Sequence, residues 1–372
     1  MRAEIMKVKG GASAIATMTF DDGHPRTSRK LNELLPKYNA KASLMLYCRK
    51  SLANGDEIAL WRDVLSEGHL SAENHSMTHD YLTSNPNYTK PEHLTEEKYI
   101  LETRDARDRI RDAFPGQDVL AFTIPYANYV PDARRHVIAT QYSALAGECV
   151  LTDPDNEGLM QSLDPSFADP ETGVTPAGCW HNVYYARLQP IYSVPRVDKG
   201  ETKAIYPQLS MDNILGYLDR CVKDGGWFLT SCHGIYQGEN QDLTEEELEM
   251  LLSRMASYGD RLWIATYTDA TKYLRERQNS TLTEREEDGI TYLDLTMKRV
   301  TSDGLPLTDE IFNMPLTVRV DTAPDCEEVE YTQAGKTCIV KTRTEDGRRF
   351  AYLELVPNGG ESKIIKKKGR AI

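Results

Sequence analysis

The 372-residue chain carries 57 acidic and 44 basic residues, which gives a formal net charge of −13 at pH 7. This acidity argues against nucleic acid or an anionic membrane as a partner and favours neutral glycans. Since no run of 18 apolar residues is present, the sequence also predicts no membrane-spanning helix.

Seven cysteines without a CxxC pair exclude a zinc ribbon and a complete set of disulfides. The first eleven residues lack the apolar core of a secretory signal. We therefore expect either an extracytoplasmic protein whose signal is absent from this chain or a cytoplasmic protein. The oligomeric state is not predicted.

Strand and helix patterns alternate from residue 14 to residue 277. Buried strands are expected at 14–18, 42–48, 69–73, 119–124, 143–145, 191–194, 227–232 and 262–265. Helices are expected at 28–38, 56–67, 95–114, 131–140, 211–223, 244–258 and 268–277. Repeated β–α units predict an α/β fold whose parallel strands gather their loops at one mouth, as in a barrel or a doubly wound sheet.

The pattern lapses between residues 147 and 189, a stretch rich in Asp, Pro and Gly. So long an irregular segment inside a compact domain is usually functional or disordered. Its aromatic residues, Trp180 among them, favour a lid or a subsite wall that stacks on sugar rings. Burial against the barrel is the alternative.

A change of pattern after residue 278 predicts a second domain. Residues 290–300, 315–320, 338–342 and 350–356 alternate with the strand period, and Ala334-Gly335 and Asp346-Gly347 supply turns. We expect a catalytic domain at 1–278, with an insertion at about 147–189, and a small antiparallel β-sandwich at 279–372. The basic end of the chain, 366–370, is expected to fray.

Two carboxylates, Asp21 and Asp22, follow the first buried strand and precede Gly23. At the C-terminal mouth of a sheet both side chains can face one cavity, where a cation or a shared proton must offset their repulsion. A surface Asp-Asp-Gly turn is the simpler alternative.

His75 and His79, four residues apart, would lie on one face of a helical turn. Together with a strand-end carboxylate they suit a three-ligand site for a divalent metal.

These two motifs, Thr19-Phe20-Asp21-Asp22-Gly23 and His75-Ser76-Met77-Thr78-His79, resemble the first two motifs of the polysaccharide deacetylase family, the NodB-homology carbohydrate esterases. The resemblance spans about residues 14–277 and implies a distorted (β/α) barrel of fewer than eight strands. It assigns Asp22, His75 and His79 as metal ligands and Asp21 as the general base. From the residues alone, the roles of Asp21 and Asp22 are interchangeable.

The resemblance continues at a later strand end. His233, which follows the strand expected at 227–232, resembles the general acid of the family, and Leu229 or its neighbours would line the pocket for an acetyl methyl group. A nucleophile made of Cys232 and His233 is rejected, because adjacent strand residues point to opposite faces. Glu73 is expected to support the metal ligands.

The third motif departs from the family. The run from Phe122 to Tyr126 resembles it, but Thr123 stands where the family has Arg. Pro125 and Tyr126 keep its end, and the resemblance implies that the Tyr126 N–H helps to hold an oxyanion.

We hypothesise that another arginine replaces the guanidinium that is missing at Thr123. Arg196, at the end of a later expected strand, would enter the site and replace it beside Asp21. Asp198 would then tune His233, a task of the fourth motif of the family, whose Asp-Trp form is not found in the chain.

The sequence thus predicts a metal-dependent hydrolase that removes acetyl groups from a carbohydrate, using a metal-activated water, an aspartate base and a histidine acid. N-deacetylation of GlcNAc-type glycans and O-deacetylation of xylan-like polymers share this mechanism, and the sequence does not separate them. A small-molecule amide hydrolase of the same fold and an inactive carbohydrate-binding relative are the alternatives. Zinc suits the ligand set best, and Co, Ni or Mn would also fit.

Overall fold

The structure is a computed structural model that describes residues 3–80, 82, 91–127, 143–146, 149–151, 157–162, 183–187, 196–198, 201–203, 211–235, 242–301 and 304–368. For the strands between residues 143 and 203 it describes the backbone only. The chain forms two compact units, Ser13–Thr271 and a second one made of Met1–Ala12 and Lys272–Ile372. Each unit is taken by itself below.

The unit Ser13–Thr271 is built on a ten-stranded, mostly parallel sheet. Its order is β12-β9-β8-β7-β6-β5-β4-β3-β2-β15, and β12 pairs with β2 as well as with β9. The strands are β2 (Ala14–Asp21), β3 (Ala42–Leu46), β4 (Leu70–Asn74), β5 (Ala121–Thr123), β6 (Ser143–Ala146), β7 (Cys149–Leu151), β8 (Glu157–Ser162), β9 (Val183–Arg187), β12 (Trp227–Cys232) and β15 (Leu262–Ile264). The expected α/β fold with a parallel sheet is therefore confirmed.

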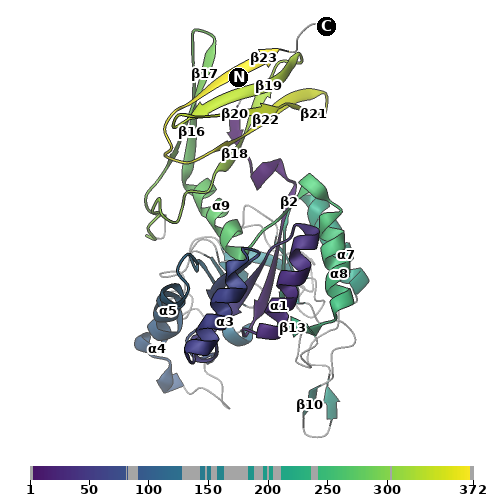
Figure 1. Cartoon of the computed structure of the whole chain (residues 1–372), viewed down its shortest axis with the longest axis vertical. Helices are drawn as coiled ribbons and strands as arrows, with labels where there is room; N and C mark the ends of the chain where they lie inside the picture. Colours follow the sequence, from purple (N-terminus) through teal and green to yellow (C-terminus); the bar gives the residue numbers. More distant parts are fainter. Residues whose placement is uncertain are drawn as a thin grey trace. The chain divides into compact units, whose positions relative to one another are not determined.

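Helices whose buried residues join one core cluster cover one face of this sheet (Figure 1). They are α1 (Pro25–Leu34), α2 (Cys48–Ser51), α3 (Gly55–Ser66), α5 (Ala106–Ala113), α7 (Met211–Asp224) and α8 (Glu245–Ala256). The chain also forms α4 (Glu96–Ile100) and α9 (Tyr267–Asn279). Alternate residues of β2, among them Met18 and Phe20, join buried residues of α1, α3, α5, α7 and α8 in one apolar core. The other residues of β2, ending with Asp21, face the opposite side of the sheet.

Helix starts follow the capping residues of the sequence. The Thr244 side chain accepts from the Glu247 N–H, and the Glu247 carboxylate accepts from the Thr244 N–H, which makes a full capping box at α8. Thr95 caps α4, as expected, by accepting from the Lys98 N–H. Between α4 and α5 the chain makes a π-helical turn, Leu101–Asp105, in place of one continuous helix.

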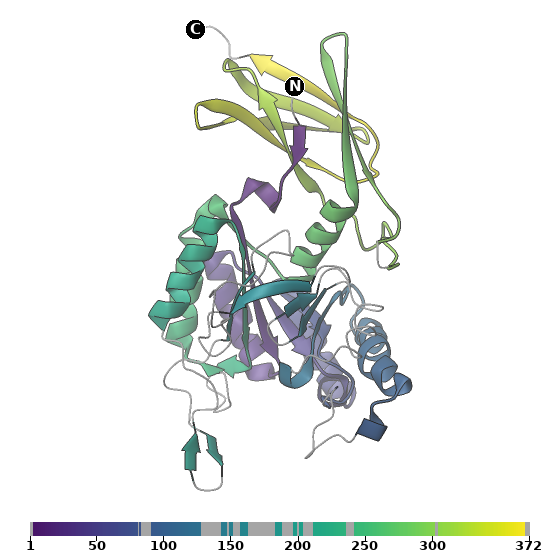
Figure 2. The same ribbon diagram turned by 180° about the vertical axis from the view of Figure 1, so that it is seen from behind.

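The stretch expected to be irregular contributes strands instead. β7, β8 and β9 all pair within the large sheet, the first of them antiparallel to its neighbours. The sheet therefore has ten strands where fewer than eight were expected, because part of the insertion joins it (Figure 2). The helix expected at 131–140, the strand expected at 191–194 and Trp180 lie outside the described residues.

Two short strand pairs complete this unit. β10 (Arg196–Asp198) pairs with β11 (Glu201–Lys203) in an antiparallel hairpin, a two-stranded sheet of its own among the described strands. β13 (Gly234–Ile235) pairs with β14 (Asp242–Leu243) directly after β12. Among the described residues, no helix is long and apolar enough to cross a membrane.

The second unit contains two antiparallel sheets, which is compatible with the expected β-sandwich. The four-stranded sheet has the order β1 (Ala3–Ile5), β18 (Leu316–Thr322), β22 (Arg348–Leu355) and β21 (Arg343–Glu345). The five-stranded sheet has the order β16 (Ser280–Glu287), β17 (Ile290–Met297), β23 (Ser362–Lys368), β19 (Cys326–Gln333) and β20 (Lys336–Lys341). The sequence missed β16, β19 and β23, whose many charged residues conceal the strand period.

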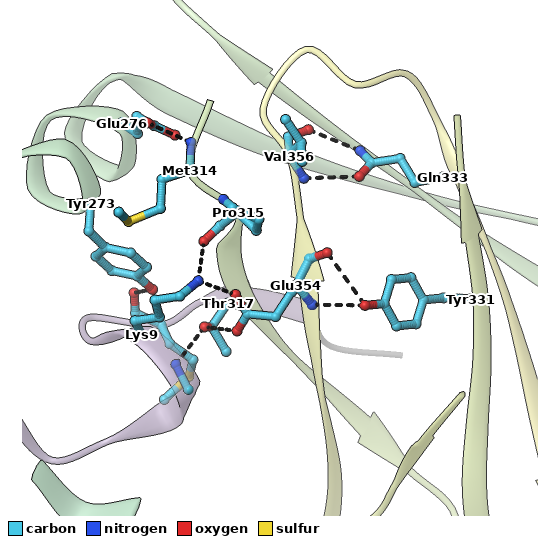
Figure 3. A network of polar contacts seen from close by, with 12 residues as sticks. Lys9, Tyr273, Glu276, Met314, Pro315, Thr317, Tyr331, Gln333, Glu354 and Val356 are labelled. Atoms are coloured by element: carbon cyan, nitrogen blue, oxygen red, sulfur yellow. Dashed lines mark hydrogen bonds and ion pairs between the residues drawn. The ribbon is translucent and has the colours of Figure 1, made fainter. Parts of the chain in front are cut away.

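The N-terminal residues belong to this second unit, which changes the expected domain boundaries. β1 pairs with β18, and Lys9 Nζ donates to Pro315 O at 3.0 Å and to Glu354 Oε2 at 2.5 Å (Figure 3). The boundary expected after residue 278 falls instead at 271/272, and residues 1–12 leave the expected catalytic domain. Lys366–Lys368, the described part of the basic end that was expected to fray, pair with β19.

Candidate metal centre and active site

The site begins where β2 ends. Asp21 is the last residue of this fully buried strand, and Asp22 and Gly23 then adopt left-handed backbone with φ of 68° and 62°. Asp tolerates this conformation better than most residues, and Gly adopts it freely. The sharp turn brings two consecutive carboxylates to the same end of the sheet.

Gly23 is required here for a second reason. A Cβ atom at this position would meet Ser51 Oγ at 2.7 Å, Leu46 Cδ2 at 3.0 Å and the Trp61 ring at 3.3 Å. The turn is thus packed tightly against α2, β3 and α3, so that the two carboxylates are held rigidly.

Three donor atoms converge beside this turn. Asp22 Oδ1 lies 3.0 Å from His79 Nε2 and 3.4 Å from His75 Nε2, and the two imidazole nitrogens are 3.1 Å apart. Asp22 Oδ1 has no hydrogen bond of ordinary geometry within the described part of the chain, so its contact with the imidazoles is chiefly electrostatic. These three residues are the ligands that the resemblance assigned. Among the described residues they form a group whose donor atoms are close enough together to hold a metal ion.

The spacing of these atoms fits a divalent ion. Ligand atoms about 2.1 Å from an ion lie about 3.4 Å apart at tetrahedral angles and about 3.0 Å apart at octahedral angles. The observed separations of 3.0–3.4 Å span that range. One carboxylate with two imidazoles is also a donor set that zinc and its first-row neighbours accept.

His75 is held in the tautomer that binds a metal. Its Nδ1 lies 2.7 Å from the carbonyl oxygen of Thr123, a contact in which the ring nitrogen must be the donor. In the neutral ring the lone pair then sits on Nε2, the atom that faces Asp22 and His79. Thr123 therefore serves the site through its backbone, whatever its side chain.

The histidine motif is a loop and not the helical turn expected from its spacing. Ser76 and His79 have φ of 82° and 64°, which no helix accommodates. The Asn74 side chain accepts from the Ser76 N–H, and the Ser76 side chain accepts from the His79 N–H, each at 2.9 Å. Local side-chain bonds of this kind replace helical ones.

Glu102 fixes this loop from the π-helical turn. Its fully buried carboxylate accepts from the N–H groups of Met77 and Thr78, both at 2.9 Å, and from the Thr78 hydroxyl at 2.6 Å. Lys98, one helical turn earlier, lies 2.7 Å away and balances the charge. Glu102 was not among the site residues predicted from the sequence. Its position on the buried face of the helix, between Tyr99 and Ala106, was the signal that was available.

Charge in the cluster favours a cation. Burial alone would raise the pKa of Asp22, but its contacts with His75 and His79 outweigh this and hold the pKa well below its usual range. Burial would likewise lower the pKa of His75, and Asp22 and Asp21 together raise it. A proton and a metal ion compete for the same Nε2 atom. The negative charge of the two carboxylates, which favours the proton there, therefore also favours a metal cation.

Asp21 and His233 complete the cluster. Asp21 Oδ1 is buried without a hydrogen-bond partner among the described residues, and burial raises the pKa of this carboxyl against the effect of His75 and His233. His233 Nε2 lies 3.8 Å from Asp22 Oδ2, and its side chain is partly exposed. Asp22 forms the possible metal-holding group with His75 and His79, and Asp21 is not a member of that group.

Other predicted site residues are placed less fully. Tyr126 is 47% exposed with φ of 60°, and Pro125 before it is buried. Leu229 is completely buried in β12. Arg196 and Asp198 lie on β10, of which only the backbone is described. Their roles therefore stay predictions.

Glu73 does not support the metal ligands in the way expected. Its carboxylate accepts from the N–H groups of Leu120 and Ala121, at 3.0 and 2.9 Å, and from the hydroxyls of Ser71 and Thr268. Burial raises its pKa to about 7. Alternate strand residues face opposite ways, which turns Glu73 away from the loop and makes it a link between β4, β5 and α9.

Comparison with known proteins agrees with the motifs. Residues 9–145 match the family model described as polysaccharide deacetylase. A curated relative, a gellan lyase from a Bacillus species, is 27% identical over 128 residues, which are 34% of this chain and 5% of that protein. The chain thus spans a small part of this relative, whose activity is not transferred.

Two solved structures are similar in outline. A putative polysaccharide deacetylase from Mycobacterium smegmatis has 12% identity and a TM-score of 0.47, covering 76% of this chain and 98% of that one. A family 4 acetyl xylan esterase from Clostridium thermocellum, bound to a cobalt ion, has 16% identity and a TM-score of 0.39, covering 69% and 89%. At TM-scores below 0.5 these similarities do not bear on function.

The family match supports the class that the motifs indicated, a carbohydrate esterase. Residues 9–145 are similar to the polysaccharide deacetylase family, and the match does not extend to the rest of the chain.

Proposed function

We propose that the chain is a metal-dependent deacetylase that removes N-acetyl or O-acetyl groups from a glycan. The observation that carries this proposal is the convergence of Asp22 Oδ1, His75 Nε2 and His79 Nε2 within 3.4 Å of one another. The family of residues 9–145 supports an acetylated carbohydrate as the substrate class. Because glycan polymers of this kind lie outside the cell membrane, we place the reaction outside the cytoplasm.

Each residue of the cluster has a chemical task in this proposal. A divalent ion, zinc in the first place, would lower the pKa of a water molecule and polarise an acetyl carbonyl when bound by Asp22, His75 and His79. Asp21 accepts the proton of the attacking water, and its buried Oδ1 is available because no described group occupies it. His233 donates a proton to the departing sugar oxygen or nitrogen.

Two further contributions belong to the proposal. The Tyr126 N–H stabilises the oxyanion, for which its left-handed backbone gives an unusual orientation next to the His79 ring. Arg196 orients Asp21 in place of the family arginine that Thr123 replaces, and Asp198 tunes His233. The distorted barrel expected from the family is supported by the double pairing of β12 with β2 and β9.

A second candidate is hydrolysis of a small non-sugar amide by the same cluster. The observation that favours it is Thr123 itself, whose hydroxyl is buried and without a partner among the described residues. The Thr123 hydroxyl could form a hydrogen bond with a substituent of such a substrate, at a position where the family has Arg instead.

Acetate release from metal-stripped protein tests the proposal. The panel is acetylated xylan, chitooligosaccharides, peptidoglycan fragments and a set of small acetamides, each with and without Zn²⁺ or Co²⁺. We expect metal-dependent release from at least one glycan, unchanged in the exposed-site control His93→Ala and lost in His79→Ala. Release from small acetamides alone would favour the second candidate. No release from any substrate, with metal bound, would contradict both.

A further inference from the structure

The two histidines of the metal centre are held in different ways. His75 has a hydrogen bond from Nδ1 to the Thr123 carbonyl oxygen. For His79, the polar contacts of the ring within the described residues are those of Nε2 with Asp22 and His75, and none involves Nδ1. A histidine that binds a metal usually has its second nitrogen fixed by a hydrogen bond. Something else must therefore orient the His79 ring.

Aromatic rings surround His79. The Tyr47 ring centroid lies 5.0 Å away with an interplanar angle of 40°, and the Tyr126 centroid lies 4.8 Å away at 60°. The His75 ring is a third neighbour at 4.8 Å and 62°. These separations lie within the range of favourable aromatic pairs.

Tyr47 is the neighbour that the backbone fixes most firmly. On one side of it, the Leu46 carbonyl accepts from the His75 N–H at 3.0 Å, and on the other the Cys48 N–H donates to the Ser76 carbonyl at 3.1 Å. Arg49 extends this ladder with a 2.8 Å bond to the Met77 carbonyl. Tyr47 is therefore bound to the same loop that carries both histidines.

Tyr126 is less suited to the same task. It is 47% exposed and lies on a short turn whose backbone is strained at this residue. Tyr47 instead follows directly from β3, inside the sheet, and precedes the short helix α2. Its ring is thus the more rigid of the two tyrosine surfaces against His79.

We propose that Tyr47 is a positioning residue of the metal centre. Its ring packs on the His79 imidazole and keeps Nε2 directed at Asp22 and His75, the task that a hydrogen bond performs for His75. The contact is between rings, so it needs the aromatic face of Tyr47 and not its hydroxyl. The inference rests on the metal centre of the proposed function and deepens it.

Direct binding of Co²⁺ to the metal-free protein tests this role, with visible absorption and calorimetry as readouts. We expect Tyr47→Leu to weaken Co²⁺ binding about 10-fold, the lower end of what residues that support metal ligands contribute. Tyr47→Phe keeps the ring and should bind within about 2-fold of the wild type. Tyr292→Leu, a half-buried tyrosine of the other unit, is the matched control.

The outcomes separate this inference from the proposed function. If Tyr47→Leu binds Co²⁺ as the wild type does, or if Tyr47→Phe is as weak as Tyr47→Leu, the positioning role is wrong while the metal centre stands. If the wild type binds no Co²⁺, both are wrong. Should Tyr47→Leu fail to fold, Tyr47→Met fills the space with a flexible apolar chain and carries the same expectation.

Discussion

Left-handed backbone occurs at non-glycine residues in both units, but for different purposes. In the unit Ser13–Thr271 four of these residues, Asp22, Ser76, His79 and Tyr126, surround the candidate metal centre. In the other unit they stand in turns, each directly before a glycine: Asp288, Ala334, Asp346 and Asn358. The first three make two-residue hairpin loops, in which positive φ at both positions matches the twist of the strands.

The two units differ in what stabilises their left-handed backbone. A hairpin turn is chosen by its own two residues, so Asp-Gly carries its conformation locally. The strained loop of the metal centre depends on distant groups, above all Glu102, which lies 24 residues after Thr78. Strain that persists through long-range support is typical of functional sites.

The largest expected effect is on turnover, and it should distinguish Asp21 from Asp22. Asp21→Asn should lower turnover by about 10²–10⁴-fold, because the base is removed, while Co²⁺ binding persists. Asp22→Asn should lose Co²⁺ binding as well. Acetate release and Co²⁺ titration of both variants, with the exposed Asp63→Asn as control, check this. Loss of the ion in Asp21→Asn and its retention in Asp22→Asn would exchange the two roles.

The turn that carries these carboxylates should be sensitive to a single methyl group. Gly23→Ala adds backbone strain and a clash with Ser51, Leu46 and Trp61, and should lower the free energy of unfolding by about 3 kcal/mol. Gly55→Ala, at the first turn of α3 with open space around it, should change stability by less than about 1 kcal/mol. Urea unfolding measures both. Equal effects would show that the turn is not rigid.

A buried carboxyl in the unit made of Met1–Ala12 and Lys272–Ile372 should make stability depend on pH. Burial raises the pKa of Glu276 from 4.5 to about 8, and its Oε1 accepts a hydrogen bond from the Met314 N–H at 3.0 Å (Figure 3). The folded state therefore holds the proton more tightly than the unfolded state, and the free energy of unfolding falls as pH rises from 4.5 to 8.

Glu276→Gln removes this titration. Its stability relative to the wild type should improve by on the order of 3 kcal/mol between pH 5 and pH 8. Urea unfolding at both pH values gives the difference directly, and the exposed Glu310→Gln serves as control. A difference that stays constant with pH would mean that Glu276 is already ionised in the folded protein.

The smallest effect concerns a hairpin turn. Ala334 has φ of 48°, a conformation that Asn favours and Ala does not, so Ala334→Asn should stabilise the unit that contains Lys272–Ile372 by about 0.5 kcal/mol. Asp346→Ala makes the reverse change at a matched turn and should destabilise it by a similar amount. Thermal unfolding midpoints of the pair check this, and shifts of the same sign would contradict it.

The sequence predicted what local patterns determine. Buried strands, capped helices and the Asp-Gly hairpin follow from the apolar period and from single capping or turn residues. It did not predict that Ala3–Ile5 completes the sheet of β18, because three residues give no periodic signal and their partner is more than 300 residues away. It also misjudged the insertion, where the strand-forming run Val183–Arg187 was hidden among turn residues.

The three residues that converge in the candidate site were named from the sequence, and the residues that hold them were not. Asp22, His75 and His79 are recognisable because metal chemistry restricts residue type and order. The Thr123 carbonyl has no side-chain signature at all, since any residue supplies the same oxygen. Tyr47 reads as an ordinary strand-end aromatic, and its contact with His79 depends on how the third and fourth strands are placed side by side.

Anomalous diffraction from a crystal grown with Zn²⁺ tests the central claim most directly. The account predicts one strong zinc peak about 2.0–2.2 Å from Asp22 Oδ1, His75 Nε2 and His79 Nε2, with Asp21 outside the ligand shell. A peak bound by Asp21 instead of Asp22, a peak at another place, or no zinc in this cluster would contradict it.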